Sequence, residues 1–137
     1  MTLTEFLLAR IAEDEAWARI HGSVVPWGVG TGRFKRNINT FAGSRIAEAI
    51  DNNLARHIAR HNPARVLAEC EAKRRIVELH VVLSWSSDGD NPRCAVCAEN
   101  EDADYDGAPP VGWPCPTLRL LALPYADHPD YDEGWRP

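Results

Sequence analysis

The sequence has no long hydrophobic run and no excess of positive charge. No apolar stretch approaches the roughly 18 residues that a transmembrane helix needs, and the first residues do not place a basic segment before an apolar one. We therefore expect no membrane span and no secretory signal. The formal net charge of −5 argues against a protein whose main task is to coat nucleic acid or an anionic membrane, since both rely on Lys and Arg. These absences predict a cytoplasmic protein.

Familiar catalytic and nucleotide-binding motifs are also missing. Gly28, Gly30 and Gly32 match neither the dinucleotide fingerprint nor the P-loop, and they favour a hairpin turn. The acidic run at residues 99–107 lacks the regular spacing of an EF-hand. No serine, cysteine or lysine nucleophile stands in a recognisable supporting motif. The sequence therefore favours a protein that is not an enzyme, without settling the question.

The composition is that of an ordinary globular chain. The 137 residues are 45% hydrophobic and 26% charged, which is enough to bury one core. We expect a mainly α protein with a small β-hairpin (α+β), built from three to four helices and a loop region held by zinc. We expect a single domain, residues 1–137, with three parts: a helical part (1–83) with a hairpin near 23–41, a zinc-stabilised segment (84–124) and an acidic aromatic tail (125–137).

The expected helices follow from apolar periodicity and capping residues. Thr2 and Glu5 form a capping box for a helix over residues 2–20. Its apolar stripe consists of Leu3, Phe6, Leu7, Ile11, Trp17 and Ile20. Ser44 is the expected N-cap of a helix that ends near His61. Further helices are predicted from Pro63, after the cap Asn62, to about Val82, and from Pro116 to Leu123. On the helix from Pro63, Cys70 falls on the apolar stripe, so we expect it in the core.

Three cysteines and a histidine have the spacing of a closed zinc site. Two residues separate Cys94 from Cys97, so both sulfurs can converge on one centre, and Cys115 follows before a predicted helix. His80 precedes this group, near the end of a predicted helix. Three thiolates and one imidazole are a structural zinc set, and a reducing compartment favours metal binding over disulfides. His128, His57 and His61 remain rivals for the fourth position.

The C-terminal tail combines acids with large aromatic rings. Asp127, Asp130, Asp132 and Glu133 stand beside Tyr125, Tyr131 and Trp135. Aromatic anchors surrounded by polar residues are typical of interfaces. We therefore expect Tyr131 and Trp135 to dock on the protein's own helices or on a partner. The Arg-rich helix faces at residues 56–75, with Arg74 and Arg75 among the candidate partner-binding residues, would complement the acids.

Two long blocks resemble a known family. One is HIARHNPARVLAE at residues 57–69, followed by EAKRR at 71–75, and the other is WPCPTLRLLALPYADHPDY at 113–131. They resemble a family of small uncharacterised proteins from actinobacteria and their phages, a domain of unknown function. That family has Asp where this chain has Asn62, and a shorter segment before the first block. The resemblance implies an actinobacterial or phage origin, with the host cytoplasm as location if a phage encodes the protein, and it brings no activity.

Three functional hypotheses follow. The first is a small zinc-binding protein that binds or regulates a protein partner. The second is a nucleic-acid-associated regulatory factor that uses the Arg-rich helices around residues 56–75. The third, and least favoured, is a metal-dependent hydrolase built on His57 and His61, which are four residues apart as in HExxH enzymes. The residue after His57 is Ile58 rather than Glu, and the sequence shows no third ligand. The sequence leaves the oligomeric state open.

Overall fold

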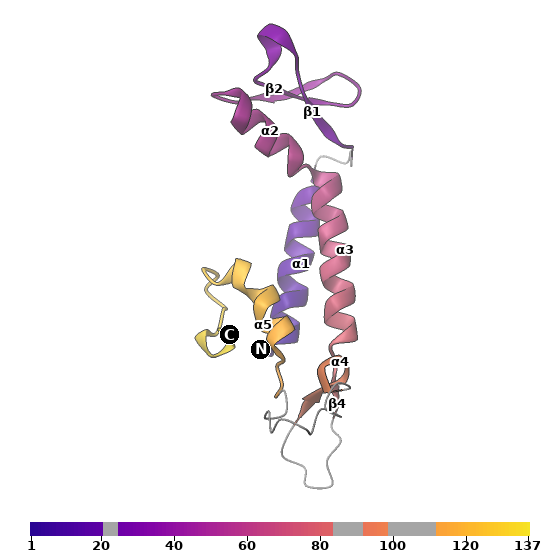
Figure 1. Ribbon diagram of the computed structural model, residues 1–137, viewed down its shortest axis with the longest axis vertical. Helices are drawn as coiled ribbons and strands as arrows, with labels where there is room; N and C mark the ends of the chain where they lie inside the picture. The colour runs from indigo at the N-terminus through magenta and orange to yellow at the C-terminus, as the bar shows by residue number, and fades with distance from the viewer. Residues whose placement is uncertain (21–24, 84–91, 99–111) are drawn as a thin grey trace, which may run out of the picture. The chain divides into compact units, whose positions relative to one another are not determined.

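The computed structural model describes residues 1–20, 25–83, 92–98 and 112–137. The chain divides into two compact units: unit 1 comprises Met1–Ile11 and Ala72–Pro137, and unit 2 comprises Ala12–Glu71. Helices and short antiparallel strands make up the described residues (Figure 1), so the predicted α+β class is confirmed. The acidic run at residues 99–107 lies outside the described residues.

Helix α1 (Leu3–Arg19) begins at the predicted capping box. The Thr2 N–H donates to Glu5 Oε2 at 2.7 Å, and the Glu5 N–H donates to Thr2 Oγ1 at 3.2 Å. The hydrogen bonds to Thr2 hold the pKa of Glu5 below its usual value. The first half of the predicted stripe is buried, at Leu3, Phe6, Leu7 and Ile11. The second half of that prediction is wrong: Trp17 and Ile20 are 72% and 59% exposed, because the periodic pattern continues beyond the part of the helix that other elements cover.

Unit 2 contains a three-stranded antiparallel sheet in the order β1-β2-β3. Strands β1 (Trp27–Val29) and β2 (Asn37–Thr40) form the predicted hairpin, with Trp27 opposite Thr40 and Val29 opposite Ile38. The 3-10 turn Gly32–Phe34 lies between them. Strand β3 (Arg45–Glu48) pairs with the other side of β2. The sheet therefore contains one strand more than the two-stranded hairpin predicted near residues 23–41.

The predicted helix start at Ser44 is wrong. Gly43 adopts a φ of +85°, in the region that favours glycine, and the chain reverses there into β3. Helix α2 (Asn52–Arg60) begins later, where Asp51 Oδ1 accepts from the N–H groups of Asn53 and Leu54 at 2.7 and 2.9 Å. The free edge of β2 offers residues 45–48 a ladder of backbone hydrogen bonds, and this tertiary pairing prevails over their helical periodicity.

A small apolar core joins the sheet of unit 2 to α2. Its buried members are Ile38, Ala49, Ala55 and Ala59, with Trp27, Val29 and Ile58 packed against them. Three of the four buried side chains are alanines, so the strand and the helix approach each other closely while little side-chain volume is buried. This core holds α2 against β1 and β2 and leaves the other helix face to solvent.

Helix α3 (Pro63–Leu79) begins as the sequence predicts. The Asn62 Oδ1 accepts from the Arg65 N–H at 3.1 Å, and Pro63 occupies the first helical position. Cys70 is 1% exposed, which confirms its assignment to the core. The helix ends at Leu79 rather than at Val82, because residues 82–83 form strand β4 (Val82–Leu83) and pair with β5 (Arg93–Cys94).

The remaining elements of unit 1 follow β5. Helix α4 (Ala95–Ala98) is a single turn, and helix α5 (Pro116–Ala122) continues into the 3-10 turn Leu123–Tyr125, as the proline at 124 predicts for a helix end. A last 3-10 turn, Glu133–Trp135, lies in the tail. None of the helices that the structure describes has the length and apolarity required to cross a membrane.

Candidate metal centre

Four residues from separate elements of unit 1 converge on one point. His80 directly follows α3, and its backbone N–H donates to the Ile76 carbonyl at 3.1 Å. Cys94 ends β5, and Cys97 lies one turn later in α4. Cys115 immediately precedes α5 and is its N-cap residue. The β4–β5 pairing brings the end of α3 beside the two-cysteine knuckle, because Val82 stands opposite Cys94.

The ligand atoms have the separations of a tetrahedral metal site. The Nδ1 of His80 lies 3.2 Å from the sulfur of Cys94, 3.6 Å from that of Cys97 and 3.4 Å from that of Cys115. All four ligand atoms lie within 4.8 Å of one another. A tetrahedral zinc ion with ordinary bond lengths would hold its nitrogen and sulfur ligands about 3.5 Å apart. One ring nitrogen cannot satisfy three thiols by hydrogen bonding alone, so a shared cation explains the geometry better.

The site is closed to solvent on most sides. Cys94 and Cys115 are 0% exposed and His80 is 9% exposed, while Cys97 is half-buried. The structure describes no disulfide among these cysteines. Four protein ligands complete a tetrahedron and leave no position for substrate or water, which is the arrangement of structural rather than catalytic zinc. The four residues can therefore hold a metal ion, and their geometry suits a structural one.

The pKa values of the thiols reflect their crowding. Burial raises the pKa of Cys94, but hydrogen bonds from the backbone N–H groups of Cys97 and Val96, and from neighbouring thiols, outweigh burial and lower it. Burial, together with Cys94 and Cys115, raises the pKa of Cys97 to about 12. Without a cation the three sulfurs thus compete for ionisation, whereas a divalent ion would supply the charge that all three thiolates need.

The rival histidines lie elsewhere. His57 and His61 belong to unit 2, His57 within α2 and His61 at its C-cap, and their ring centroids are 4.5 Å apart. His128 contacts the guanidinium of Arg10 through its ring nitrogens. Within the described residues, His80, Cys94, Cys97 and Cys115 form the one group of three or more His, Cys, Asp or Glu side chains that could hold a metal.

The tail folds back onto the first helix. The ring of Phe6, which is 0% exposed, lies 5.9 Å from that of Tyr131 and 5.1 Å from that of Trp135, centroid to centroid. The rings of Tyr125 and His128 also meet Phe6, at 6.4 and 5.7 Å. We call these five rings the Phe6 cluster. Tyr131 and Trp135, the predicted anchors, therefore pack within the protein.

Polar contacts hold the same segment. The buried Arg10 approaches His128, and its guanidinium lies 3.9 Å from the carboxylate of Asp130. Lys73 Nζ donates to the Tyr125 hydroxyl at 3.0 Å. The expected partners of the acids were the helix faces at residues 56–75, but the cation that meets Asp130 comes from α1. The role of Arg74 and Arg75 stays a prediction.

Sequence reasoning did not predict two features of unit 1: the short strands β4 and β5, and the burial of Arg10. Strands β4 and β5 are two residues each, too short for a periodic pattern, although Val81 and Val82 were β-branched residues at the end of an apparent helix. Arg10 also gave no sign of burial, because a single arginine on an amphipathic helix is usually exposed. Its role depends on His128, which lies 118 residues away in sequence.

One family model matches the whole chain. It is the model of the family of unknown function DUF6221, and it spans residues 1–137. No curated protein and no solved structure matches the chain.

Proposed function

The chain belongs to the family of unknown function DUF6221, and we propose that it is a zinc-stabilised binding protein whose metal is structural and whose partner is a protein. The observation that carries the proposal is the convergence of His80, Cys94, Cys97 and Cys115 within 4.8 Å. We further propose that the protein comes from an actinobacterium or one of its phages and acts in the bacterial cytoplasm. This part of the proposal rests on the two sequence blocks at residues 57–75 and 113–131.

The donor set favours zinc among the metals. Thiolates select soft or borderline ions, and the mixture of three sulfurs with one imidazole suits tetrahedral zinc. Ca²⁺ and Mg²⁺ prefer oxygen ligands, which this cluster does not offer. When bound, zinc would supply the positive charge that three buried thiolates require. His80 and Cys115 would then fix the end of α3 and the start of α5 relative to the knuckle.

The surface beside the centre supports a binding role. Leu79, Val81, Val82 and Val96 are exposed, with fractions of 62%, 48%, 46% and 38%. Leu79, Val81 and Val82 lie within four residues of one another in the sequence. Exposed apolar side chains that gather in a patch are a common mark of protein interaction sites. A structural zinc would keep this apolar surface rigid, so that a partner would not have to order it on binding. The predicted partner-binding residues Arg74 and Arg75 belong to the same helix, α3, one or two turns earlier.

Metal analysis of the protein purified without chelator tests the first half of the proposal. We expect one zinc per chain, and loss of zinc in Cys94→Ser. Replacement by Co²⁺ should give the absorption of a tetrahedral site with thiolate ligands. A fully folded protein without any metal would overturn the proposal.

A pull-down from native cell extract tests the second half. The double variant Leu79→Ser/Val82→Ser should keep its zinc and lose the partner. Ile20→Ser/Ile50→Ser removes two apolar side chains that are 59% and 81% exposed elsewhere in the chain, and it is the matched control. Equal partner capture by both variants would reject the surface beside the metal centre.

A further inference from the structure

Positive charge is concentrated in one part of unit 2. Residues 25–65 contain seven Lys or Arg and two Asp or Glu, a formal net charge of +5. The rest of the chain contains eight Lys or Arg and eighteen Asp or Glu. An acidic protein thus carries a basic sheet and helix. Such an asymmetry between regions is typical of proteins that meet a polyanion with one part of the molecule.

A hollow beside α2 is lined by side chains that can donate hydrogen bonds to an anion. It has a volume of about 470 Å³ and is lined by Arg56, His57, Arg60 and His61. No carboxylate lines it. The carbonyl of His57 can only accept, so Nδ1 of His61 carries the proton of their 2.9 Å hydrogen bond, and Nε2 of His61 remains for a ligand. The hollow therefore presents two guanidinium groups and two imidazoles to solvent.

The arginines of the hollow are not neutralised within the part of the chain that the structure describes. Several other arginines of unit 2 are paired with carboxylates: Arg36 lies 2.5 Å from Glu48, and Arg65 lies 2.6 Å from Glu69. Arg56 and Arg60, in contrast, make no ion pair with any described residue. Two uncompensated guanidinium groups one helical turn apart repel each other, and an anion placed between them would relieve that repulsion.

A metal ion fits the hollow less well than an anion. His57 and His61 could offer two nitrogens, but no third metal-binding side chain accompanies them among the described residues. Two arginines beside the ring pair would also repel a cation. Guanidinium groups match the geometry of phosphate oxygens, which they can bind in pairs of hydrogen bonds. The chemistry of the hollow is that of a phosphate site.

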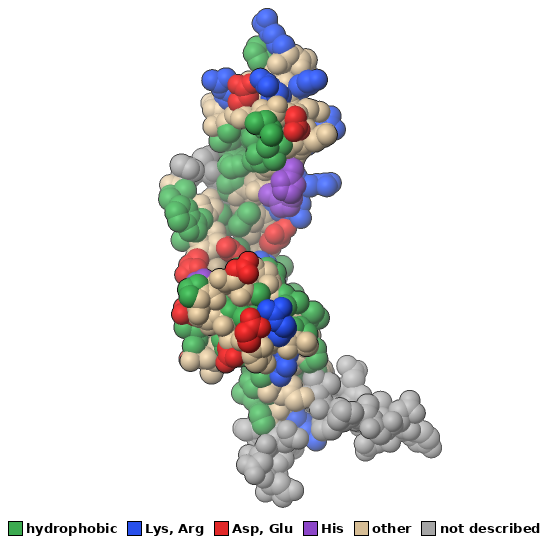
Figure 2. Space-filling model, turned by 90° about the vertical axis from the view of Figure 1, so that its left-hand side faces the viewer, with side chains coloured by type: hydrophobic (Ala, Val, Ile, Leu, Met, Phe, Trp, Pro, Cys, Tyr) green, Lys and Arg blue, Asp and Glu red, His purple; other side chains and the backbone are tan. Residues whose placement is uncertain are grey.

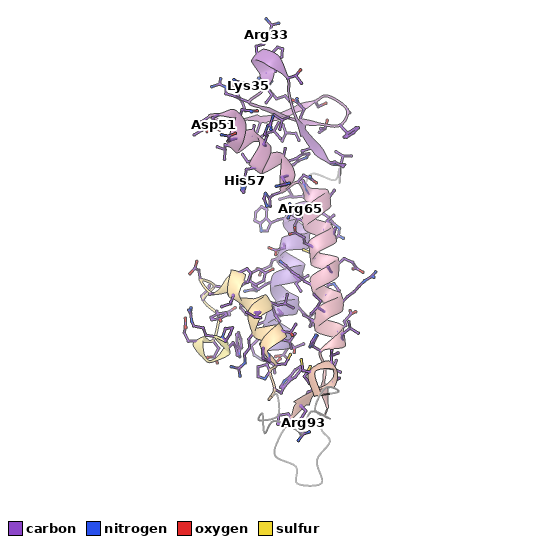
Figure 3. The ribbon with its side chains drawn as sticks, in the orientation of Figure 1. Arg33, Lys35, Asp51, His57, Arg65 and Arg93 are labelled. Carbon is purple, nitrogen blue, oxygen red and sulfur yellow. The ribbon has the colours of Figure 1, made fainter. Side chains whose placement is uncertain are left out.

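The basic region also exposes aromatic rings. Phe34 and Phe41 are 51% and 85% exposed, which is unusual for phenylalanine. The guanidinium carbon of Arg33 lies 4.9 Å from the centroid of the Phe34 ring. Figure 2 shows Lys, Arg and His side chains at the surface. Figure 3 labels Arg33 and Lys35 in the connection between β1 and β2, and His57 on α2. Cationic side chains interleaved with exposed rings are the pattern of single-strand binding surfaces.

We propose that this surface of unit 2, formed by Arg33, Lys35, Phe34, Phe41 and the hollow of α2, binds single-stranded nucleic acid. Arg56 and Arg60 hold the phosphodiester backbone with the help of His57 and His61, and the exposed phenylalanine rings stack on bases. Affinity then comes mainly from phosphates and stacking, so it is strongly salt-dependent and weakly dependent on sequence. The binding does not depend on the zinc proposed for unit 1.

Fluorescence anisotropy of the full-length protein with a labelled single-stranded 20-nucleotide DNA of mixed sequence tests the proposal. The wild-type protein should bind with a dissociation constant of about 100 µM or below at physiological salt, the range of non-specific nucleic-acid binding. Arg56→Gln/Arg60→Gln should weaken binding by about tenfold or more, as two charge-assisted contacts are lost. The same variant should reduce the slope of log affinity against log salt by about 1.4, since each phosphate contact on a single strand contributes about 0.7.

The control keeps the same change in net charge. Arg19→Gln/Arg136→Gln removes two exposed arginines outside residues 25–65, each paired with a carboxylate three or four residues away. Its affinity should change by less than about twofold, because exposed ion pairs contribute little. Phe34→Leu/Phe41→Leu should lose about tenfold for the single strand, and less for a duplex whose bases are not free to stack. Circular dichroism should show the same melting temperature for all variants.

Three outcomes would overturn the assignment. One is no binding of the single strand by the wild-type protein at 50 mM salt. Another is an equal loss in the α2 variant and its charge-matched control, which would mean that overall charge alone governs binding. The third is binding to vesicles of phosphatidylserine and phosphatidylcholine without binding to the oligonucleotide, which would assign the cationic hollow to lipid headgroups. A chelator-treated sample that still binds the oligonucleotide separates this result from any failure of the zinc proposal.

Discussion

The two compact units are stabilised in different ways. Unit 1 depends on special chemistry: three cysteines and a histidine that can hold a metal, and the aromatic Phe6 cluster that joins the tail to α1. Unit 2 depends on a core of one isoleucine and three alanines, and on hydrogen-bonded caps and strands. Unit 1 thus relies on side chains with special chemistry, whereas the cluster that joins the sheet to α2 in unit 2 is built mostly from small apolar side chains.

The largest effect should come from removing the metal ligands of unit 1. Cys94→Ser should abolish metal binding and unfold the segments around β5 and α5, since structural zinc contributes about 10–16 kcal/mol of apparent binding free energy in small zinc-binding peptides. Hydrogen exchange should show lost protection at residues 93–98 and 115–122, with unit 2 unchanged. Cys70→Ala is the control: it should keep the metal and cost roughly 1 kcal/mol. Loss of metal in that control would contradict the assignment of Cys70 to the core.

Removing the centre of the Phe6 cluster should have the next largest effect. Phe6→Ala should destabilise unit 1 by about 3–5 kcal/mol, because a fully buried ring is lost and the tail loses its contact. Urea unfolding measures the change, and metal content should stay at the wild-type value. Phe41→Ala deletes a ring that is 85% exposed and should cost less than about 0.5 kcal/mol. Deletion of residues 125–137 should resemble Phe6→Ala; unchanged stability after that deletion would show that the tail contributes nothing.

The same kind of truncation in unit 2 sharpens the comparison. Ile38→Ala should cost about 2–4 kcal/mol, since Ile38 is the one large side chain fully buried in that core. Urea unfolding followed by tryptophan fluorescence, to which Trp27 on this core contributes, should report the loss. The control Ile50→Ala should be nearly neutral, because Ile50 is 81% exposed. If both variants were equally stable, the small core would not be what holds the sheet to α2.

The smallest effect concerns the cap of α2. Asp51→Ala removes the acceptor of two N–H hydrogen bonds and should cost about 1 kcal/mol. Asp51→Asn keeps an accepting oxygen and should restore most of the loss. The change should appear in the melting of unit 2 and leave the metal content of unit 1 unaltered. A similar loss of stability in Ser44→Ala would instead support Ser44 as the N-cap, as the sequence predicted.

The sequence predicted what depends on neighbouring residues. The capping box at Thr2 and the cap at Asn62 act over three residues, and the cysteine knuckle acts over two, so each was visible in the chain itself. His80 was predicted as the fourth ligand because it precedes the knuckle at a helix end, and the structure places it in the cluster. These features could be predicted because their geometry is local.

The predictions that were wrong concern residues whose conformation depends on contacts distant in sequence. Residues 45–48 have a helical pattern of apolar side chains, but the open edge of β2 decides their conformation. The helix from Pro63 was predicted to extend to about Val82, but the pairing of Val82 with Cys94 makes it a strand residue. Each outcome depends on a partner distant in sequence, which neither propensity nor periodicity can identify.

The contact between Phe6 and Trp135 has a consequence for biosynthesis. The two rings are 5.1 Å apart, and they belong to opposite ends of the chain, which Figure 1 marks as N and C. Unit 2 is continuous, Ala12–Glu71, so it can form while the rest of the chain is still being translated. Unit 1 needs segments from both sides of unit 2, Met1–Ile11 and Ala72–Pro137, so the rings of Tyr131 and Trp135 cannot cover Phe6 until residue 135 has been synthesised. A nascent chain that has not reached residue 135 would therefore expose Phe6, an aromatic side chain that chaperones and proteases can recognise.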